Sequence, residues 1–188
     1  MRYFQLLYDY ENDSDYIYCE GENEKAIEKE LLYRSEMIQK WEENTTFIYD
    51  INDGHIISDY IANSLIIPMI SEGCYNIFQE RIIDSVQFLP VLIEEKNTNK
   101  KNNAYILNVL SVIEGAIDFE KSVFDIFKVE EIEITSFRKH VLKADIISGT
   151  HIFRLKEDPL AIFVSEQIKD LIDNSMLKGF DYLEVSLQ

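Results

Sequence analysis

Residues 70–91, ISEGCYNIFQERIIDSVQFLPV, align without a gap with residues 164–185, VSEQIKDLIDNSMLKGFDYLEV. The offset is a constant 94 residues, and apolar residues of the first copy fall on apolar residues of the second. Two copies of so long a period are too few for a solenoid, which needs at least about three stacked repeats. The sequence therefore predicts one domain over residues 1–188, with two related halves at approximately 45–94 and 104–188 after an acidic segment, 1–44.

A Ser-Glu pair opens each copy and is typical of the start of an α-helix. The hydroxyl groups of Ser71 and Ser165 can each accept a hydrogen bond from a free backbone N–H of the first turn. The glutamate that follows each serine lies where the helix dipole favours a negative charge. Apolar residues at helical spacing then give each helix one buried face. We therefore predict two Ser-capped helices, each followed by a strand, at 86–93 and 180–187.

The rest of the chain contains more predicted strands than helices, since most runs are short and rich in β-branched and aromatic residues. One exposed amphipathic helix is predicted over residues 24–40, and residues 94–103 are predicted to be a polar loop. The fold class that follows is α+β: a mainly antiparallel sheet with the two Ser-capped helices of the internal duplication on one side. Further strands are predicted at 2–8, 16–19, 45–51, 65–70, 105–112, 132–135, 141–147, 151–155 and 161–164, and residues 119–127 fit either element.

The chain is strongly acidic, with a net charge of −17. The part up to Glu94 holds 6 basic and 19 acidic residues, and the remainder holds 12 and 16. Such a field repels nucleic-acid phosphates, so no nucleic-acid partner is expected. It would attract a basic protein partner and speed association with it. Plain solubility explains the charge equally well, and the sequence leaves both explanations open.

No pattern in the sequence predicts catalysis, a metal or a cofactor. Its six glycines are scattered, and the chain has neither a Gly-rich phosphate loop nor a Gly-x-Ser-x-Gly elbow. His55 and His151 each lie near a glycine and are interpreted as structural. Alternating acids from Asp9 to Asp15 match several positions of a calcium-binding loop, but Ser14 stands where the sharp turn needs glycine. We therefore expect a protein that is not an enzyme.

Cysteine usage and hydropathy favour the cytoplasm. Cys19 and Cys74 lie far apart and belong to no Cys-x-x-Cys pair, which fits free thiols in a reducing compartment. The first residues lack the apolar core and cleavage site of a signal peptide. The longest uncharged runs have 12 residues, whereas a membrane-spanning helix needs about 20. No membrane partner is expected.

Several short motifs, taken in order, resemble a bacterial protein family. They are PMISE at 68–72, VQFLPV at 86–91, YILNVL at 105–110, GTHIFRL at 149–155, FVSE at 163–166 and LKGF at 177–180. The chain resembles immunity family eleven of polymorphic toxin systems, formerly a domain of unknown function. The resemblance covers roughly residues 45–188, and residues 1–44 carry less of it.

The resemblance implies a single immunity-type domain that neutralises a cognate bacterial toxin domain, encoded nearby, by stoichiometric binding. The family offers no catalytic residue to carry over. A basic, nuclease-like toxin would be attracted by the acidic N-terminal segment, whose candidate partner-binding residues are Asp9, Glu11, Asp13, Asp15, Glu20, Glu22 and Glu24. Two alternatives stay open: a small enzyme with a cleft between the two halves, and an oligomeric structural module. The sequence does not give the oligomeric state.

Overall fold

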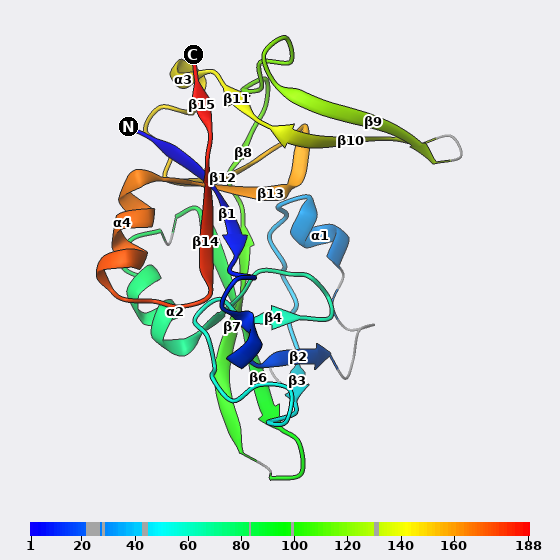
Figure 1. Ribbon diagram of the computed structural model, residues 1–188, viewed down its shortest axis with the longest axis vertical. Helices are drawn as coiled ribbons and strands as arrows, with labels where there is room; N and C mark the ends of the chain where they lie inside the picture. Colours follow the sequence, from blue (N-terminus) through cyan, green and yellow to red (C-terminus); the bar gives the residue numbers. More distant parts are fainter. Residues whose placement is uncertain (22–26, 28, 43–44, 83, 99, 130–131) are drawn as a thin grey trace.

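The computed structural model describes residues 1–21, 27, 29–42, 45–82, 84–98, 100–129 and 132–188, and every structural statement below concerns these residues. They form two larger sheets and two strand pairs, with four α-helices (Figure 1). Most neighbouring strands are antiparallel, so the described chain is mostly sheet with short helices, as expected for the α+β class. None of the described helices is long and apolar enough to cross a membrane.

The first sheet has five strands in the order β14-β1-β13-β12-β8. Strand β1 lies antiparallel between β13 and β14, and only β12 and β8 are parallel neighbours. Successive side chains of β1 alternate between faces, so that Tyr3 packs into one core cluster and Phe4 into another. The strands are β1 (Tyr3–Tyr8), β8 (Val112–Ile113), β12 (Ile152–Leu155), β13 (Asp158–Ser165) and β14 (Phe180–Glu184).

The second sheet has six strands in the order β4-β2-β3-β6-β7-β5. Its long hairpin, β6–β7, buries Leu89 and Val91 on one face and Leu107 and Val109 on the other. Because both faces are covered, these strands contain nearly continuous apolar runs. The strands are β2 (Tyr18–Gly21), β3 (Thr46–Tyr49), β4 (Ala62–Asn63), β5 (Met69–Ser71), β6 (Val86–Glu95) and β7 (Lys101–Val109).

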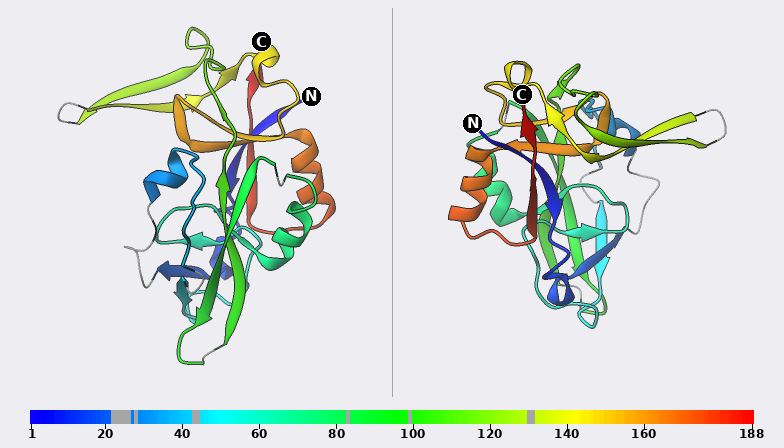
Figure 2. Two further views of the ribbon diagram at one scale, coloured as in Figure 1. Left: turned by 180° about the vertical axis from the view of Figure 1, so that it is seen from behind. Right: turned by 45° about the horizontal axis from the view of Figure 1, so that its top comes forward.

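Two further strand pairs are formed by residues after Ser122. Strand β9 (Val123–Val129) pairs with β10 (Ile132–Lys139) in a hairpin that extends away from the body of the molecule, and we call this hairpin the arm (Figures 1 and 2). Strand β11 (Val141–Leu142) pairs in parallel with β15 (Ser186–Leu187). The arm is therefore joined to the body only at its root.

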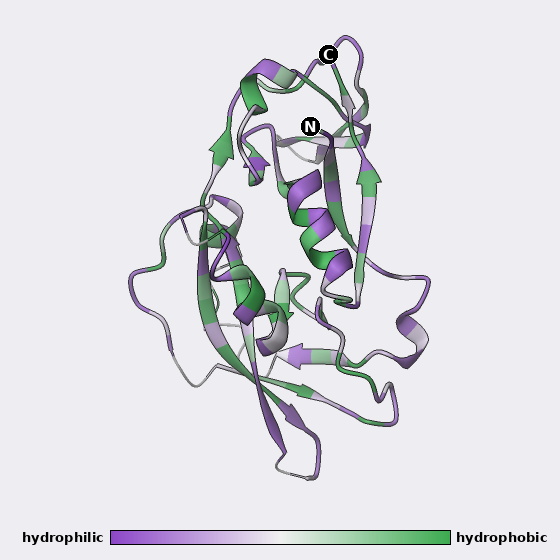
Figure 3. Ribbon diagram, turned by 90° about the vertical axis from the view of Figure 1, so that its left-hand side faces the viewer, coloured by the Kyte–Doolittle hydropathy of each residue, from purple (hydrophilic) through white to green (hydrophobic). Residues whose placement is uncertain are grey.

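Helices α2 (Glu72–Phe78) and α4 (Glu166–Asn174) lie on the same side of the molecule (Figure 3). Cys74 and Phe78 of α2 share one core cluster with Ile168 and Ile172 of α4 and with strands of both sheets. This cluster joins the two sheets into one core. The remaining helices are short: η1 (Asp13–Asp15), α1 (Lys29–Tyr33) and α3 (Ala144–Ile147).

The two copies of the repeat have the same local topology. In the first, β5 leads into α2 and then β6, and both strands lie antiparallel to β7 between them. In the second, β13 leads into α4 and then β14, and both strands lie antiparallel to β1 between them. Each copy is thus a split β-α-β unit. The central strand follows the first unit but comes from the N-terminus in the second, and the origin of the two units by duplication stays a prediction.

Four of the predicted elements differ from the structure. The helix expected over 24–40 is described as helical only at Lys29–Tyr33, and residues 22–26 and 28 lie outside the described part. After that helix the backbone of Ile38 bonds instead to the side-chain amide of Gln87 on β6, through Ile38 N–H to Oε1 and Nε2–H to the Ile38 carbonyl. The loop expected at 94–103 is present but shorter, because β6 runs to Glu95 and β7 begins at Lys101. The strand expected at 65–70 begins only at Met69, and residues 144–147 form α3 instead of extending a strand.

Candidate functional site

A cleft of about 420 Å³ lies between the root of the arm and the body, and we call it the arm cleft. Its walls come from β1 and the residues after it, the connection around β4 and β5, strand β10 and the β12–β13 hairpin. These segments are far apart in the sequence. The lining residues are Gln5, Leu6, Leu7, Tyr8, Tyr10, Tyr33, Tyr60, Ile66, Pro68, Ile134, Thr135, Ser136, Phe137, Arg154, Asp158, Leu160, Ala161 and Ile162.

Ile66 stands at one edge of the arm cleft in an unusual conformation. Its φ is +55°, in the left-handed region that a β-branched residue rarely adopts. The buried amide of Asn63 holds this loop: Nδ2 donates to the carbonyls of Ile61 and Ile67, and Oδ1 accepts from the Ile67 N–H. The adjacent Leu65 is buried, whereas Ile66 is 83% exposed. The loop therefore presents a large apolar side chain to solvent at the expense of backbone strain.

Other exposed apolar side chains gather around the same cleft. Tyr10 is 73% exposed and Leu160 is 66% exposed, and both line it. Ile134 of the arm is also exposed and lines the cleft, and its cross-strand partner Phe127 lies exposed on the same face of the hairpin. Exposed apolar side chains gathered around a concave site are typical of a protein-binding site.

Tyrosine rings connect the arm cleft to the core. The Tyr8 ring packs edge-on against Tyr10, with ring centroids 5.1 Å apart, and lies 6.2 Å from Tyr60. Tyr60 in turn stacks on Phe180 at 5.1 Å. Loss of contact with water raises the pKa of Tyr8 to about 12, and the charge of Asp13 adds to the shift. The Tyr8 phenol therefore stays neutral at physiological pH and offers a flat apolar face with a hydrogen-bonding tip.

The charged groups of the arm cleft are held by structural contacts. Asp158 lies 2.9 Å from Nε2 of His140, which is buried and stacks on Phe137 at the root of the arm. This contact ties β10 to β13. Among the described carboxyl groups, the pKa is shifted for Asp50 and Glu166. Neighbouring hydrogen-bond donors lower the pKa of both, and neither residue lines the cleft. In the described part of the chain, no three His, Cys, Asp or Glu side chains are grouped to hold a metal.

The structure places the predicted acidic residues along one connection. Asp9 follows β1, and its carboxylate accepts hydrogen bonds from the backbone of Glu11 and Asn12. Asp13 and Asp15 form the ends of η1, and Asp13 lines a hollow of about 320 Å³ that shares Tyr8, Tyr10, Tyr60 and Ile66 with the arm cleft. Glu20 is exposed on β2, and Glu22 and Glu24 lie outside the described residues. Their role in binding stays a prediction.

The two predicted helix caps differ. Ser71 Oγ accepts a hydrogen bond from the Cys74 N–H at 3.1 Å, as a cap does, and its hydroxyl contacts Asp59. Ser165 also stands at an N-cap position, but its side chain makes no capping bond. Its hydroxyl lies instead 3.0 Å from Nδ1 of His151. The prediction of a capping side chain is therefore wrong for Ser165. The structural interpretation fits His151, whereas His55 is exposed.

The exposed apolar residues of the arm cleft were absent from the sequence predictions. Leu160 lies just before the strand predicted at 161–164, and Ile134 lies within the strand predicted at 132–135. Neither strand prediction indicates which side chains are exposed. The exposed position of Ile66 depends on a hydrogen-bonded loop built by Asn63, which leaves no periodic signal. One sign of the arm is the segment 119–127, which from the sequence fits either helix or strand and which contains the exposed apolar residues Val123, Ile126 and Phe127.

A model of the immunity protein family (Imm11) matches residues 2–186. This match confirms the resemblance drawn from the motifs and extends it through the N-terminal segment. A comparison with curated proteins found no match.

Proposed function

The chain belongs to the immunity protein family (Imm11), and from this premise we propose that it neutralises a cognate toxin domain by binding it in the arm cleft. The single observation that carries this proposal is the gathering of exposed apolar residues around one concave site: Tyr10, Ile66, Ile134 and Leu160. Specific complexes bury roughly 800 Å² per partner and depend on a few large apolar or aromatic side chains.

The arm adds a surface that the body alone does not offer. It extends from the molecule beside the cleft, so a partner seated there would contact the arm and the body together (Figure 2). The acidic connection after β1 borders the adjoining hollow through Asp13. This arrangement supports a toxin surface that is basic at its edge, as in a nuclease whose groove binds phosphates. Inhibition then acts by covering the toxin, with no chemical step, inside the cytoplasm.

The test is co-expression of this chain with the toxin-like domain encoded beside its gene, followed by a growth assay and isolation of the complex. Growth rescue with a 1:1 complex is the expected result. The informative variant is Ile66→Asn, because asparagine tolerates the left-handed conformation while it removes the exposed apolar side chain. Burial of such a side chain is worth about 1.5–3 kcal/mol, so the affinity should fall tenfold or more.

The chain offers a closely matched control in Met176. It has a φ of +54° and is 83% exposed, as Ile66 is, but it follows α4 and does not line the cleft. Met176→Asn should leave the affinity unchanged. Equal loss in both variants, or none in either, would place the binding surface elsewhere. Absence of rescue and of a complex with the wild-type chain would contradict the function itself.

A further inference from the structure

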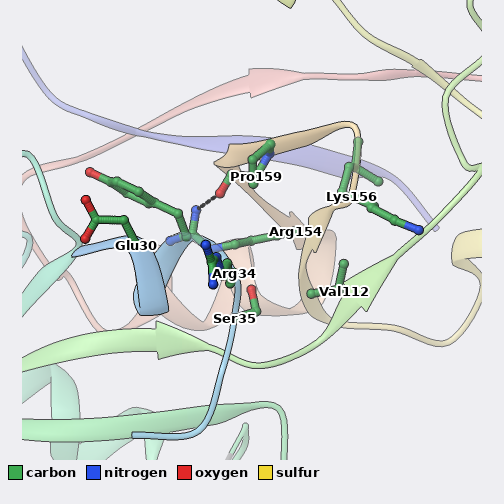
Figure 4. Close-up of a pocket in the computed structure, with 9 residues that line it drawn as sticks. Glu30, Arg34, Ser35, Val112, Arg154, Lys156 and Pro159 are labelled. Atoms are coloured by element: carbon green, nitrogen blue, oxygen red, sulfur yellow. Dashed lines mark hydrogen bonds between the residues drawn. The ribbon is translucent and has the colours of Figure 1, made fainter. Parts of the chain in front are cut away.

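Figure 4 shows the residues that line a second hollow, of about 400 Å³. This hollow and the arm cleft share Tyr33 and Arg154 in their walls. We call the second hollow the arginine pocket. It lies between the end of α1 and the β12–β13 hairpin, two segments that are distant in sequence. Its position makes it a continuation of the proposed toxin-binding surface.

Arg154 is a buried cation without a close counter-ion. The residue is 1% exposed, and no carboxylate oxygen among the described residues lies within 4.0 Å of its guanidinium, so that Asp158 acts on it only from a longer distance. Nη1 donates to the carbonyls of Pro159 and Leu160, at 2.6 and 2.9 Å. Nε is buried and has no hydrogen-bond partner in the described chain. A buried charge that lacks both a close counter-ion and a full set of hydrogen bonds is costly, which favours a ligand that supplies them.

Ser35 is a second unsatisfied group in the same pocket. Its Oγ is buried and, within the described residues, has no hydrogen-bond partner. Its φ of +58° is explained by the end of α1, where the Ser35 N–H donates to the Leu32 carbonyl and the Glu36 N–H donates to the Leu31 carbonyl. Its unpaired hydroxyl has no such explanation, and unpaired buried polar atoms are uncommon. The Ser35 hydroxyl and the Arg154 Nε therefore both point to a missing polar ligand.

Basic and acidic side chains share the mouth of the pocket. Arg34 and Lys156 line it beside Arg154, so three of the chain's 18 basic residues meet here. Both outer side chains are exposed and have acidic neighbours, Glu36 at 3.9 Å from Arg34 and Glu114 at 2.7 Å from Lys156. Glu30 also lines the pocket, on the opposite side of Arg154 from Lys156 (Figure 4).

We propose that the arginine pocket receives an acidic side chain of the cognate toxin, whose carboxylate pairs with Arg154. A planar guanidinium matches a carboxylate in geometry, and the Ser35 hydroxyl can donate a further hydrogen bond. The walls formed by Val112, Leu155 and Pro159 are apolar and suit the methylene stem of an aspartate or glutamate better than a fully hydrated inorganic anion. The inference rests on the proposed function, because it adds a specific anchor to the same binding surface.

The first test needs no toxin. Propionate, which has a carboxylate and a short apolar stem, is titrated into the ¹⁵N-labelled chain at constant ionic strength, and the Arg154 Nε–H resonance is followed. That resonance is assigned by its loss in Arg154→Lys. A saturable shift is expected, with affinity about threefold weaker in the double variant Arg34→Gln, Lys156→Gln. No saturable shift, or a response to inorganic phosphate alone, would overturn the proposal.

The second test uses the toxin complex and separates this inference from the function itself. The double variant changes only exposed side chains, so it should fold as the wild type does, and circular dichroism checks this. Its affinity for the toxin should fall about fivefold or more, while Lys101→Gln on β7 and Lys178→Gln after α4, combined as a control with the same charge change, should have less effect. Equal affinity of the wild type and the double variant would overturn the anchor but leave immunity standing. If the wild type forms no complex with the toxin, the proposed function is overturned. The propionate titration alone then tests whether the arginine pocket binds a carboxylate.

Discussion

Single residues of the arm cleft show where stability and binding compete. Ile66 adopts a left-handed backbone conformation and exposes most of its side chain, although either feature alone is unfavourable for isoleucine. The surrounding loop enforces this position through the three hydrogen bonds of Asn63. Such strain is retained where the exposed side chain serves a purpose other than folding.

Ile66→Asn should therefore stabilise the free protein. The left-handed conformation costs a residue with a branched side chain about 1–2 kcal/mol, and asparagine relieves much of it while little apolar burial is lost. We expect the free energy of unfolding in urea to rise by about 1 kcal/mol. Met176→Asn should show a similar but smaller gain, since methionine is not β-branched. A clear loss of stability in Ile66→Asn would show that the side chain contributes to the fold.

The two cysteines provide a test of the core at the same scale. Cys19 and Cys74 are free and fully buried, and burial raises the pKa of both thiols, for Cys19 to about 12. Neither forms the reactive thiolate at neutral pH. Ellman's reagent should therefore modify the native protein only at the rate of unfolding, and should modify both thiols at once in guanidinium chloride. Rapid modification of one thiol in the native state would contradict the buried position.

The same shift has a consequence for alkaline stability. The unfolded chain ionises its thiols near their ordinary pKa of 9.0, whereas the folded chain keeps them protonated to higher pH. The folded state thus binds more protons, and its stability falls as the pH rises above 9. The double variant Cys19→Ala, Cys74→Ala should be less stable overall. Between pH 8 and 10, its free energy of unfolding in urea should lack this part of the pH dependence.

At the scale of elements, hydrogen bonds at one short connection add to the shared core cluster that joins the two split β-α-β units. The Lys178 carbonyl accepts hydrogen bonds from the N–H groups of Asp59 and Tyr60, and the Asp59 carboxylate accepts from the Lys178 N–H. The same carboxylate accepts from the hydroxyl of Ser71, the cap of α2. The end of α4 is thereby tied to the start of α2, which explains how two units with separate sheets share one core.

Gly179 makes this connection sterically feasible. Its φ is +87°, and a Cβ added there would lie 2.6 Å from the Tyr60 carbonyl oxygen. Gly115 is the matched control, with a φ of +75° and no atom within 4 Å of an added Cβ. Alanine at Gly115 should cost about 1–2 kcal/mol from the backbone alone, and Gly179→Ala should cost about 3 kcal/mol or more because a clash is added. Equal losses in urea unfolding would show that the connection can relax.

How far the sequence predicts these elements depends on how local their causes are. The Ser71 cap, the strand at 3–8 and the strand at 152–155 follow from signals within a few residues, and they are found where expected. Ser165 carries the same local signal, but a tertiary contact with His151 takes its hydroxyl. The helix expected over 24–40 is likewise replaced by hydrogen bonds to Gln87, which lies 49 residues away from Ile38. The arm cleft is assembled from distant segments, so its composition could not be read from any one of them.

At the scale of the whole molecule, the acidic charge is unevenly distributed and should control how fast a partner arrives. The exposed acids Glu11, Asp13, Asp15 and Glu20 lie on the connection and strand that follow β1, near the hollow that adjoins the arm cleft. Asp9 is left unchanged in the test because its carboxylate holds the backbone of this connection. Replacing the other four by their amides removes charge without removing bulk.

With the cognate toxin, this fourfold variant should associate about tenfold more slowly at low ionic strength, as expected when electrostatic steering toward a basic partner is lost. The difference should vanish at high salt, because the Debye length then falls to about 3 Å. The control is the same change of charge on the side of α4, with amides at Asp170, Asp173, Asp181 and Glu184, all exposed. Stopped-flow association rates that fall equally in the two variants would show that net charge alone matters, and an unchanged rate in the first would show that the acidic connection does not steer the toxin.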